Sequence, residues 1–214
     1  IRTVFAFKIM FLSSKNINNE QLPYFKALVG KELGSIRFAL IENASDLHKE
    51  ENKGFVYDTR SALMNLGMQI ELIDIHEYIN NGDAIVGKLK DFDVIWIGGG
   101  NTYYIRYLLK ITELDKHLKE LIQSGIVYGG GSAGAIVAGP TIKTFHEADS
   151  PTYEMIDSGL HLCDFVVIPH WDDADFKDRA NSIKQYYDTT DYKTILLNDD
   201  QAIVVENSIC KIIP

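Results

Sequence analysis

Short apolar runs alternate along the chain with longer amphipathic runs, and this alternation restricts the fold more than any other feature of the sequence. The strand-like runs cover residues 8–14, 35–42, 68–75, 92–99, 125–130, 164–170, 194–198 and 202–206, followed by an apolar stretch to Ile213. The helix-like runs cover residues 20–33, 54–66, 101–123, 132–139 and 174–188. Such alternation predicts a mostly parallel sheet with helices on both faces. We expect the last strands to form a meander or hairpin.

The junctions between strands and helices are the expected places for function. Ligands of open α/β sheets bind outside the carboxyl ends of the strands. Three junctions carry glycine or polar residues suited to a site: Gly98–Thr102, Gly129–Ala135 and Pro169–Asp173.

The sequence GGGSAG, at the second of these junctions, fits two incompatible patterns. Gly129, Gly131 and Gly134 fit G-x-G-x-x-G, which binds a dinucleotide pyrophosphate. Gly130, Ser132 and Gly134 fit G-x-S-x-G, a strained turn that presents a nucleophilic serine. Both readings require a strand before the turn and a helix after it, and both conditions are met.

The serine pattern explains more of the surrounding residues. A dinucleotide site needs an acidic residue about 20 positions later at a strand end. Asp149 has roughly that spacing, but it lies in TFHEADSPTYE, which does not resemble a strand end. Small neighbours permit the tight turn at Ser132, and the N–H of Ala133 would begin a helix, where it could stabilise an oxyanion.

A nucleophilic serine needs a base, and the base needs an orienting carboxylate. Of the six histidines, His170 ends the apolar strand FVVIPH, and we expect it at the same edge of the sheet as Ser132. Spacing alone does not choose among the nearby carboxylates, which are Glu147, Asp149, Asp164, Asp172 and Asp173.

Composition narrows the class of protein. The net charge of −9 argues against nucleic-acid binding. No CxxC or HExxH motif occurs, so we expect no metal, and Cys163 and Cys210 are expected to be buried free thiols. Lys8 interrupts the first apolar run, and no run reaches the roughly 18 apolar residues of a membrane helix, so we expect a cytoplasmic protein. Residues 1–7 precede the first recognisable strand, and their role is left open.

Three motifs together resemble peptidase family S51, which includes the aspartyl dipeptidases and the cyanophycinases. They are GGGNT (98–102), GGGSAGAIVAGPTIKT (129–144) and VVIPHWDD (166–173). The resemblance runs from about Lys8 to the C-terminus. It implies a single domain over residues 1–214, folded as a three-layer α/β/α sandwich like class I glutamine amidotransferases, a flavodoxin-like arrangement.

The resemblance also implies roles for individual residues. Ser132 would be the nucleophile and His170 the general base and acid. Glu147, where the family's dipeptidases have aspartate, would be the third member of the triad, with Asp149 in reserve.

Further residues would complete the site. N–H groups of Ala133 and of Gly99 or Gly100 would form the oxyanion hole. Asn101 would cap the next helix beside the substrate, and Arg179 would hold a substrate carboxylate.

The sequence therefore predicts a serine peptidase that cleaves small peptides, most of all dipeptides with N-terminal aspartate, without a cofactor. Two alternatives stay open: another serine hydrolase, such as an esterase or amidase, and a non-catalytic ligand-binding or regulatory domain on the same fold. A homodimer is compatible with the sequence, and nothing in it indicates a nucleic-acid or membrane partner.

Overall fold

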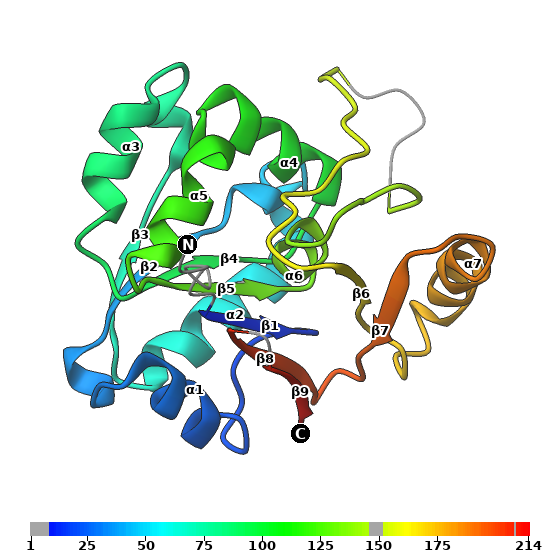
Figure 1. Ribbon diagram of the computed structural model, residues 1–214, viewed down its shortest axis with the longest axis horizontal. Helices are drawn as coiled ribbons and strands as arrows, with labels where there is room; N and C mark the ends of the chain where they lie inside the picture. The colour runs from blue at the N-terminus through cyan, green and yellow to red at the C-terminus, as the bar shows by residue number, and fades with distance from the viewer. Residues whose placement is uncertain (1–8, 146–151, 208) are drawn as a thin grey trace, which may run out of the picture.

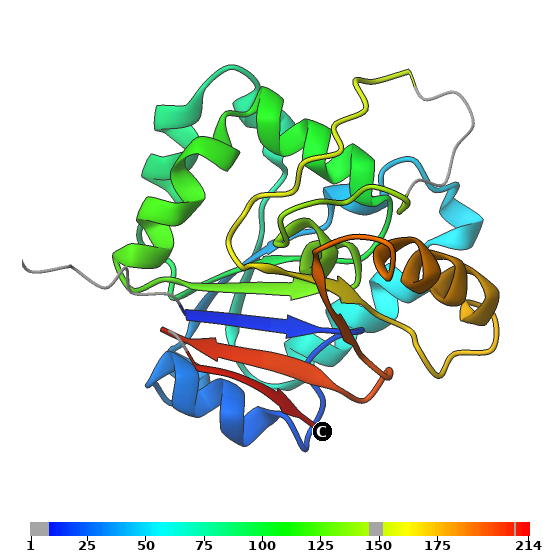
Figure 2. The same ribbon diagram turned by 45° about the vertical axis from the view of Figure 1, so that its right-hand side comes forward.

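A computed structural model describes residues 9–145, 152–207 and 209–214 of the chain (Figure 1). Its centre is a seven-stranded sheet in the order β3-β2-β4-β5-β1-β8-β9. The strands of this sheet are β1 (Ile9–Ser13), β2 (Arg37–Ile41), β3 (Gln69–Leu72), β4 (Val94–Ile97), β5 (Val127–Gly131), β8 (Ala202–Glu206) and β9 (Ile209–Ile213). The first five are parallel to one another, and β8 and β9 form an antiparallel hairpin at one edge. Figure 2 shows β1 lying between β5 and β8.

Helices cover both faces of this sheet, which makes the three-layer α/β/α sandwich (Figure 1). One face carries α1 (Leu22–Val29) and α2 (Gly54–Asn65), and the other carries α3 (Gly82–Leu89), α4 (Thr102–Ile111), α5 (Leu114–Gln123) and α6 (Ala133–Val137). A hydrophobic core lies on each face of the sheet. Because successive strand residues point to opposite faces, β4 contributes side chains to both cores. Trp96 packs with Phe38 on the side of α1, while Ile95 and Ile97 join the larger core on the other side.

Short 3-10 turns occupy several connections, at Leu33–Ser35, Asn43–Ser45, Glu50–Asn52 and Ile75–Tyr78. Among the described residues, no helix has the length and apolar character needed to cross a membrane. Cys163 is buried, as expected, whereas the thiol of Cys210 is exposed on the edge strand β9, against expectation.

The structure corrects the predicted position of the strand before His170. That strand, β6 (Phe165–Ile168), does not join the central sheet but pairs in parallel with β7 (Lys193–Leu196) in a separate two-stranded sheet. Helix α7 (Lys177–Tyr187) connects these two strands. The predicted meander of the last strands is therefore reduced to the β8–β9 hairpin, because β7 pairs with β6.

Two helical predictions also differ from the structure. The single helix expected over residues 101–123 is two helices, because Glu113 takes a left-handed conformation with φ of 61° between α4 and α5. Helix α3 was not predicted. It is eight residues long, contains two glycines and begins at a cap from the side chain of Asn81.

Candidate active site

Ser132 lies in the tight turn between β5 and α6. Its backbone has φ of 49° and ψ of −108°, values that a side-chain-bearing residue rarely adopts. Its N–H donates to the carbonyl of Ser13 at 3.1 Å, and its own carbonyl accepts from the N–H groups of Ala135 and Ile136. These bonds fix the turn from both sides, so the strained conformation is held by the neighbouring strand and helix.

Glycines at two positions allow this turn to pack closely. A Cβ atom on Gly134 would lie 2.0 Å from the carbonyl oxygen of Ile97, and one on Gly130 would lie 2.4 Å from the carbonyl carbon of Gly134. Both distances are far below van der Waals contact. The spacing Gly130, Ser132, Gly134 is therefore required by packing, as the G-x-S-x-G pattern predicts.

His170 faces Ser132 from the loop after β6. Its Nε2 lies 2.9 Å from Oγ of Ser132, and its Nδ1 lies 2.6 Å from Oδ1 of Asp199. Its backbone φ of 59° is again in the left-handed region. The side chains of His170 and Asp199 are mostly buried, at 13% and 19% exposed. Serine, imidazole and carboxylate thus form one hydrogen-bonded chain, the arrangement of a serine-hydrolase triad.

The carboxylate of this chain is not one that the sequence analysis chose. Glu147 and its reserve Asp149 lie outside the described residues, while Asp199 occupies the position next to Nδ1 of His170. Asp199 follows β7, which was expected to pair elsewhere, and this is why it was missed. The only sequence signal for it was an acidic pair, Asp199 and Asp200, directly after a strand-like run.

Asp199 is held in its ionised form. Burial acts to raise the pKa of this carboxyl group, but hydrogen bonds from Lys15 and His170 outweigh burial, and the pKa lies below its ordinary value. An ionised Asp199 can orient the imidazole and stabilise the imidazolium that forms when His170 accepts a proton.

The first junction lies beside the serine, as expected. Strand β4 neighbours β5, and a Cβ atom on Gly99 would lie 3.4 Å from Cβ of Ser132. The flanking N–H groups of Gly98 and Asn101 donate to the carbonyls of Ile41 and Ala44 at 2.9 and 2.7 Å. These bonds fix the Gly99–Gly100 segment next to the serine, where an oxyanion hole shared with Ala133 would have to lie.

Asn101 is a capping residue. Its side chain is buried, and its Oδ1 accepts hydrogen bonds from the N–H of Tyr104 at 2.9 Å and from the hydroxyl of Tyr153 at 3.1 Å. The first of these is the helix cap that the sequence predicts. We therefore assign Asn101 to the start of α4 rather than to direct contact with a substrate.

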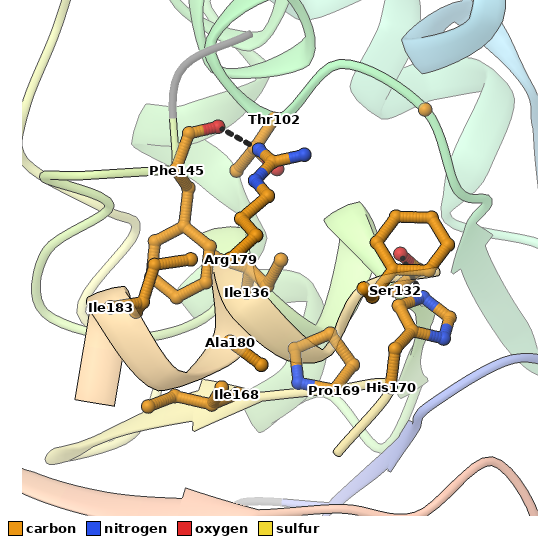
Figure 3. Close-up of a pocket in the computed structure, with 12 residues that line it drawn as sticks. Thr102, Ser132, Ile136, Phe145, Ile168, Pro169, His170, Arg179, Ala180 and Ile183 are labelled. Atoms are coloured by element: carbon orange, nitrogen blue, oxygen red, sulfur yellow. Dashed lines mark hydrogen bonds between the residues drawn. The ribbon is translucent and has the colours of Figure 1, made fainter. Parts of the chain in front are cut away.

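Two cavities meet at the triad. The smaller, of about 410 Å³ including space open to solvent, lies between α7 and the serine turn and is mainly apolar, with Arg179 in its wall (Figure 3). The larger, of about 1400 Å³ including space open to solvent, extends toward α2. Gly100, Ser132, His170 and Phe176 line both. A ligand that spans both cavities would therefore place its middle next to the hydroxyl of Ser132.

Arg179 lies in the first turn of α7 and is half-buried. Its Nη2 donates to the backbone carbonyl of Phe145 at 3.0 Å, as the dashed line in Figure 3 marks. This bond keeps the guanidinium in the wall of the smaller cavity. The predicted contact between Arg179 and a substrate carboxylate is therefore compatible with its position.

His170 and Asp199 form with Asp173 a cluster that has the spacing of a cation site. Ligand atoms of His170, Asp173 and Asp199 lie within 4.8 Å of one another. The ammonium group of Lys15 already lies 2.5 Å from Asp199 and 4.0 Å from Asp173. The ammonium group therefore neutralises the two carboxylates, and the imidazole nitrogens of His170 already contact Ser132 and Asp199. For these reasons we assign no metal to the cluster.

Comparison with known proteins decides the family. The family model "Peptidase family S51" matches residues 9–213. The chain belongs to peptidase family S51. This membership makes it a peptidase by family and agrees with the resemblance of its three motifs.

Individual relatives agree with this assignment. An uncharacterized peptidase of Listeria innocua is 32% identical over 72% of this chain and 78% of its own length. A peptidase E of Nostoc is 30% identical over 78% of this chain and 66% of its own length.

The same architecture occurs in solved structures. A crystal structure described as a candidate peptidase E from Listeria monocytogenes superposes with a TM-score of 0.83, covers 97% of this chain and 98% of its own, and is 26% identical. A peptidase from an acI-B1 actinobacterium, at 20% identity and a TM-score of 0.70, shares the fold.

Proposed function

We propose that the protein is a serine peptidase that hydrolyses small peptides, foremost dipeptides with an N-terminal aspartate, through a Ser132–His170–Asp199 triad. The observation that carries the proposal is the hydrogen-bonded chain from Oγ of Ser132 through the imidazole to the Asp199 carboxylate, at 2.9 and 2.6 Å. It lies where two cavities meet, as cleavage of a bond between two residues requires.

The reaction proceeds in two halves. Oγ of Ser132 attacks the peptide carbonyl carbon while Nε2 of His170 takes the hydroxyl proton, which gives a tetrahedral oxyanion. N–H groups of Ala133 and of Gly99 or Gly100 donate to this oxyanion. The imidazolium then protonates the departing amine, the C–N bond breaks, and an ester on Ser132 remains. His170 then takes a proton from water as the water oxygen attacks the ester carbonyl carbon, and the imidazolium returns that proton to Oγ of Ser132 as the C–O bond breaks and the acid product leaves.

Substrate preference rests on the smaller cavity. A carboxylate side chain of the first residue would lie beside the guanidinium of Arg179, which could donate a charge-assisted hydrogen bond to it. The remaining lining there is mostly apolar, including Ile136, Phe145 and Ile183, so the charged pair would be shielded from water. The departing residue would lie in the larger cavity. A cytoplasmic location and the absence of a cofactor are parts of the same proposal.

A panel of free dipeptides tests the substrate class. Amine release is measured for Asp-Leu, Glu-Leu, β-Asp-Leu and Ala-Leu at equal concentrations, and p-nitrophenolate release is measured for a p-nitrophenyl ester. We expect Asp-Leu to have the highest kcat/KM. Turnover of the ester alone would favour the esterase alternative, and binding of peptides without any turnover would favour the ligand-binding alternative.

A further inference from the structure

Two consecutive residues after β1, Ser14 and Lys15, both contact Asp199, which lies more than 180 positions later in the chain. The two oxygens of the Asp199 carboxylate have different partners. Oδ1 faces the imidazole of His170 and the hydroxyl of Ser14, at 2.6 and 3.0 Å. Oδ2 faces the ammonium group of Lys15 at 2.5 Å. Because both oxygens have hydrogen-bond partners, rotation of the carboxylate would break at least one of these bonds.

Ser14 also holds His170 directly. Its side chain is fully buried, and its Oγ accepts the backbone N–H of His170 at 2.8 Å. A hydroxyl has one proton, so Oγ of Ser14 must donate that proton to Asp199 while it accepts from His170. The N–H of Ser14 is itself fixed by the carbonyl of Gln201 at 3.1 Å. One buried hydroxyl therefore sets the relative position of the base and its carboxylate.

Lys15 affects the local charge around Asp199 more than it affects the stability of the fold. Its side chain is 51% exposed, and ion pairs at exposed sites contribute little to folding. Its hydrogen bond with Asp199 raises the pKa of the ammonium group, against the opposing effect of burial, and the negative charges of Asp199, Asp173 and Asp172 act in the same direction as the bond. The lysine therefore stays charged beside three carboxylates.

We propose that Ser14 and Lys15 are positioning residues of the triad. Ser14 fixes the position of Asp199 relative to His170 through its two hydrogen bonds. Lys15 contacts Oδ2 of Asp199 and offsets the negative charge of the nearby carboxylates. The inference rests on the proposed serine-peptidase function but concerns residues outside the three that react.

Substitutions at Ser14 test the geometric part. The variant Ser14→Ala removes both hydrogen bonds, and we expect kcat to fall about 10- to 100-fold with KM changed less than about twofold. Ser13→Ala is the matched control. Ser13 is equally buried, but its hydroxyl only approaches the carbonyl of Gly130 at 3.4 Å, so its loss should leave kcat within about twofold.

Substitutions at Lys15 test the electrostatic part, and we expect these variants to fold because the side chain is 51% exposed. In Lys15→Met the carboxylates of Asp173 and Asp199 lie near the imidazole without the charge of the lysine, and Asp172 accepts from the N–H of Asp199. His48 and Asp58 line the same cavity. A protonated imidazole is then more favourable. The acidic limb of the kcat/KM profile should therefore move to higher pH, and Lys15→Arg, which keeps the charge, should leave the limb near its native position.

A fluorophosphonate probe separates this inference from the proposed function. The rate at which it labels Ser132 reports the reactivity of the serine without any peptide. Labelling that slows at least about tenfold in Ser14→Ala supports positioning, even if the native protein cleaves no dipeptide in the panel. Unchanged labelling and kcat in both Ser14→Ala and Lys15→Met would overturn it. A rise in KM alone in Lys15→Met would instead make Lys15 a substrate contact and overturn its positioning role.

Discussion

His170 and Asp199 contact each other because the strands that precede them, β6 and β7, run in parallel side by side. Ile168 of β6 is in register with Leu196 of β7, and the pairing continues as Leu197 donates to Ile168 and accepts from Trp171, each at 3.0 Å. The two-stranded sheet thus places the imidazole of His170 and the carboxylate of Asp199 together. The central sheet contributes the serine separately, at the end of β5.

Replacing Asp199 by asparagine should remove most of the activity. An amide cannot stabilise the imidazolium and favours the wrong tautomer of His170, so we expect kcat to fall on the order of 10³- to 10⁴-fold with a small change in KM. Asp200→Asn is the neighbouring control and should keep native activity. The variants Glu147→Gln and Asp149→Asn test the carboxylates that the sequence analysis chose. A loss in Glu147→Gln as large as in Asp199→Asn would restore the original assignment.

The lowered pKa of Asp199 predicts a contribution to stability that depends on pH. A carboxylate with a folded-state pKa below its unfolded value stabilises the fold above the unfolded value of about 4, and that stabilisation is lost as pH falls through the folded value. Urea unfolding of native protein and Asp199→Asn at several pH values measures this. The difference in unfolding free energy should shrink as pH falls from about 5 to 2. A difference independent of pH would contradict the assignment.

Gly134→Ala should destabilise the serine turn. The added methyl group would lie 2.0 Å from the carbonyl oxygen of Ile97, so the turn must move, at a cost of about 1–3 kcal/mol or more. Gly87→Ala in α3 is the control, since its added methyl meets nothing within 4 Å. In a helix that change should be neutral or stabilising by up to about 1 kcal/mol. Thermal unfolding compares the two variants, and equal melting temperatures would refute the packing argument.

Arg179→Met should change substrate preference rather than chemistry. Loss of a charge-assisted contact costs about 2–3 kcal/mol, so kcat/KM for Asp-Leu should fall about 100-fold. For Ala-Leu it should stay within a few-fold of native, because the first residue of this peptide has no side-chain carboxylate. Steady-state kinetics on both peptides measures the ratio. An equal loss on both would mean that Arg179 only supports the fold near Phe145.

Phe176 should separate the two cavities. Its ring stacks on the imidazole of His170 with centroids 4.8 Å apart, and it lines both cavities. We expect Phe176→Ala to weaken discrimination by the size of the first residue and to lower kcat several-fold through a looser imidazole. Phe55→Ala, a comparably exposed ring that lines the larger cavity but not the smaller, should alter only the preference for the departing residue. Identical profiles for the two variants would contradict this division.

The sequence predicts most of the fold because the strand and helix periods are regular. The positions of β1, β2, β4 and β5 follow from apolar runs, and the glycines after β4 and at the end of β5 mark the turns beside the site. Local sterics decide these features. Long-range pairing is not encoded locally, so the departure of β6 from the central sheet could not be foreseen. The same limit hid Asp199, since an acidic residue after a strand becomes a triad member only through that pairing.

The contact between Ser14 and His170 could not be predicted from the sequence for a similar reason, because the two residues are far apart in the chain. Ser14 lies in an unremarkable SSKN segment after the first strand, and nothing nearby points to His170. The interpretation of Asn101 as a cap succeeded because capping depends on the following four residues alone.

Hydrolysis of Asp-Leu by native protein and by Ser132→Ala, measured side by side, tests whether Ser132 is the nucleophile. We expect turnover by native protein and, in the variant, none above the uncatalysed rate although the peptide still binds. Equal turnover in both proteins would show that Ser132 is not the nucleophile.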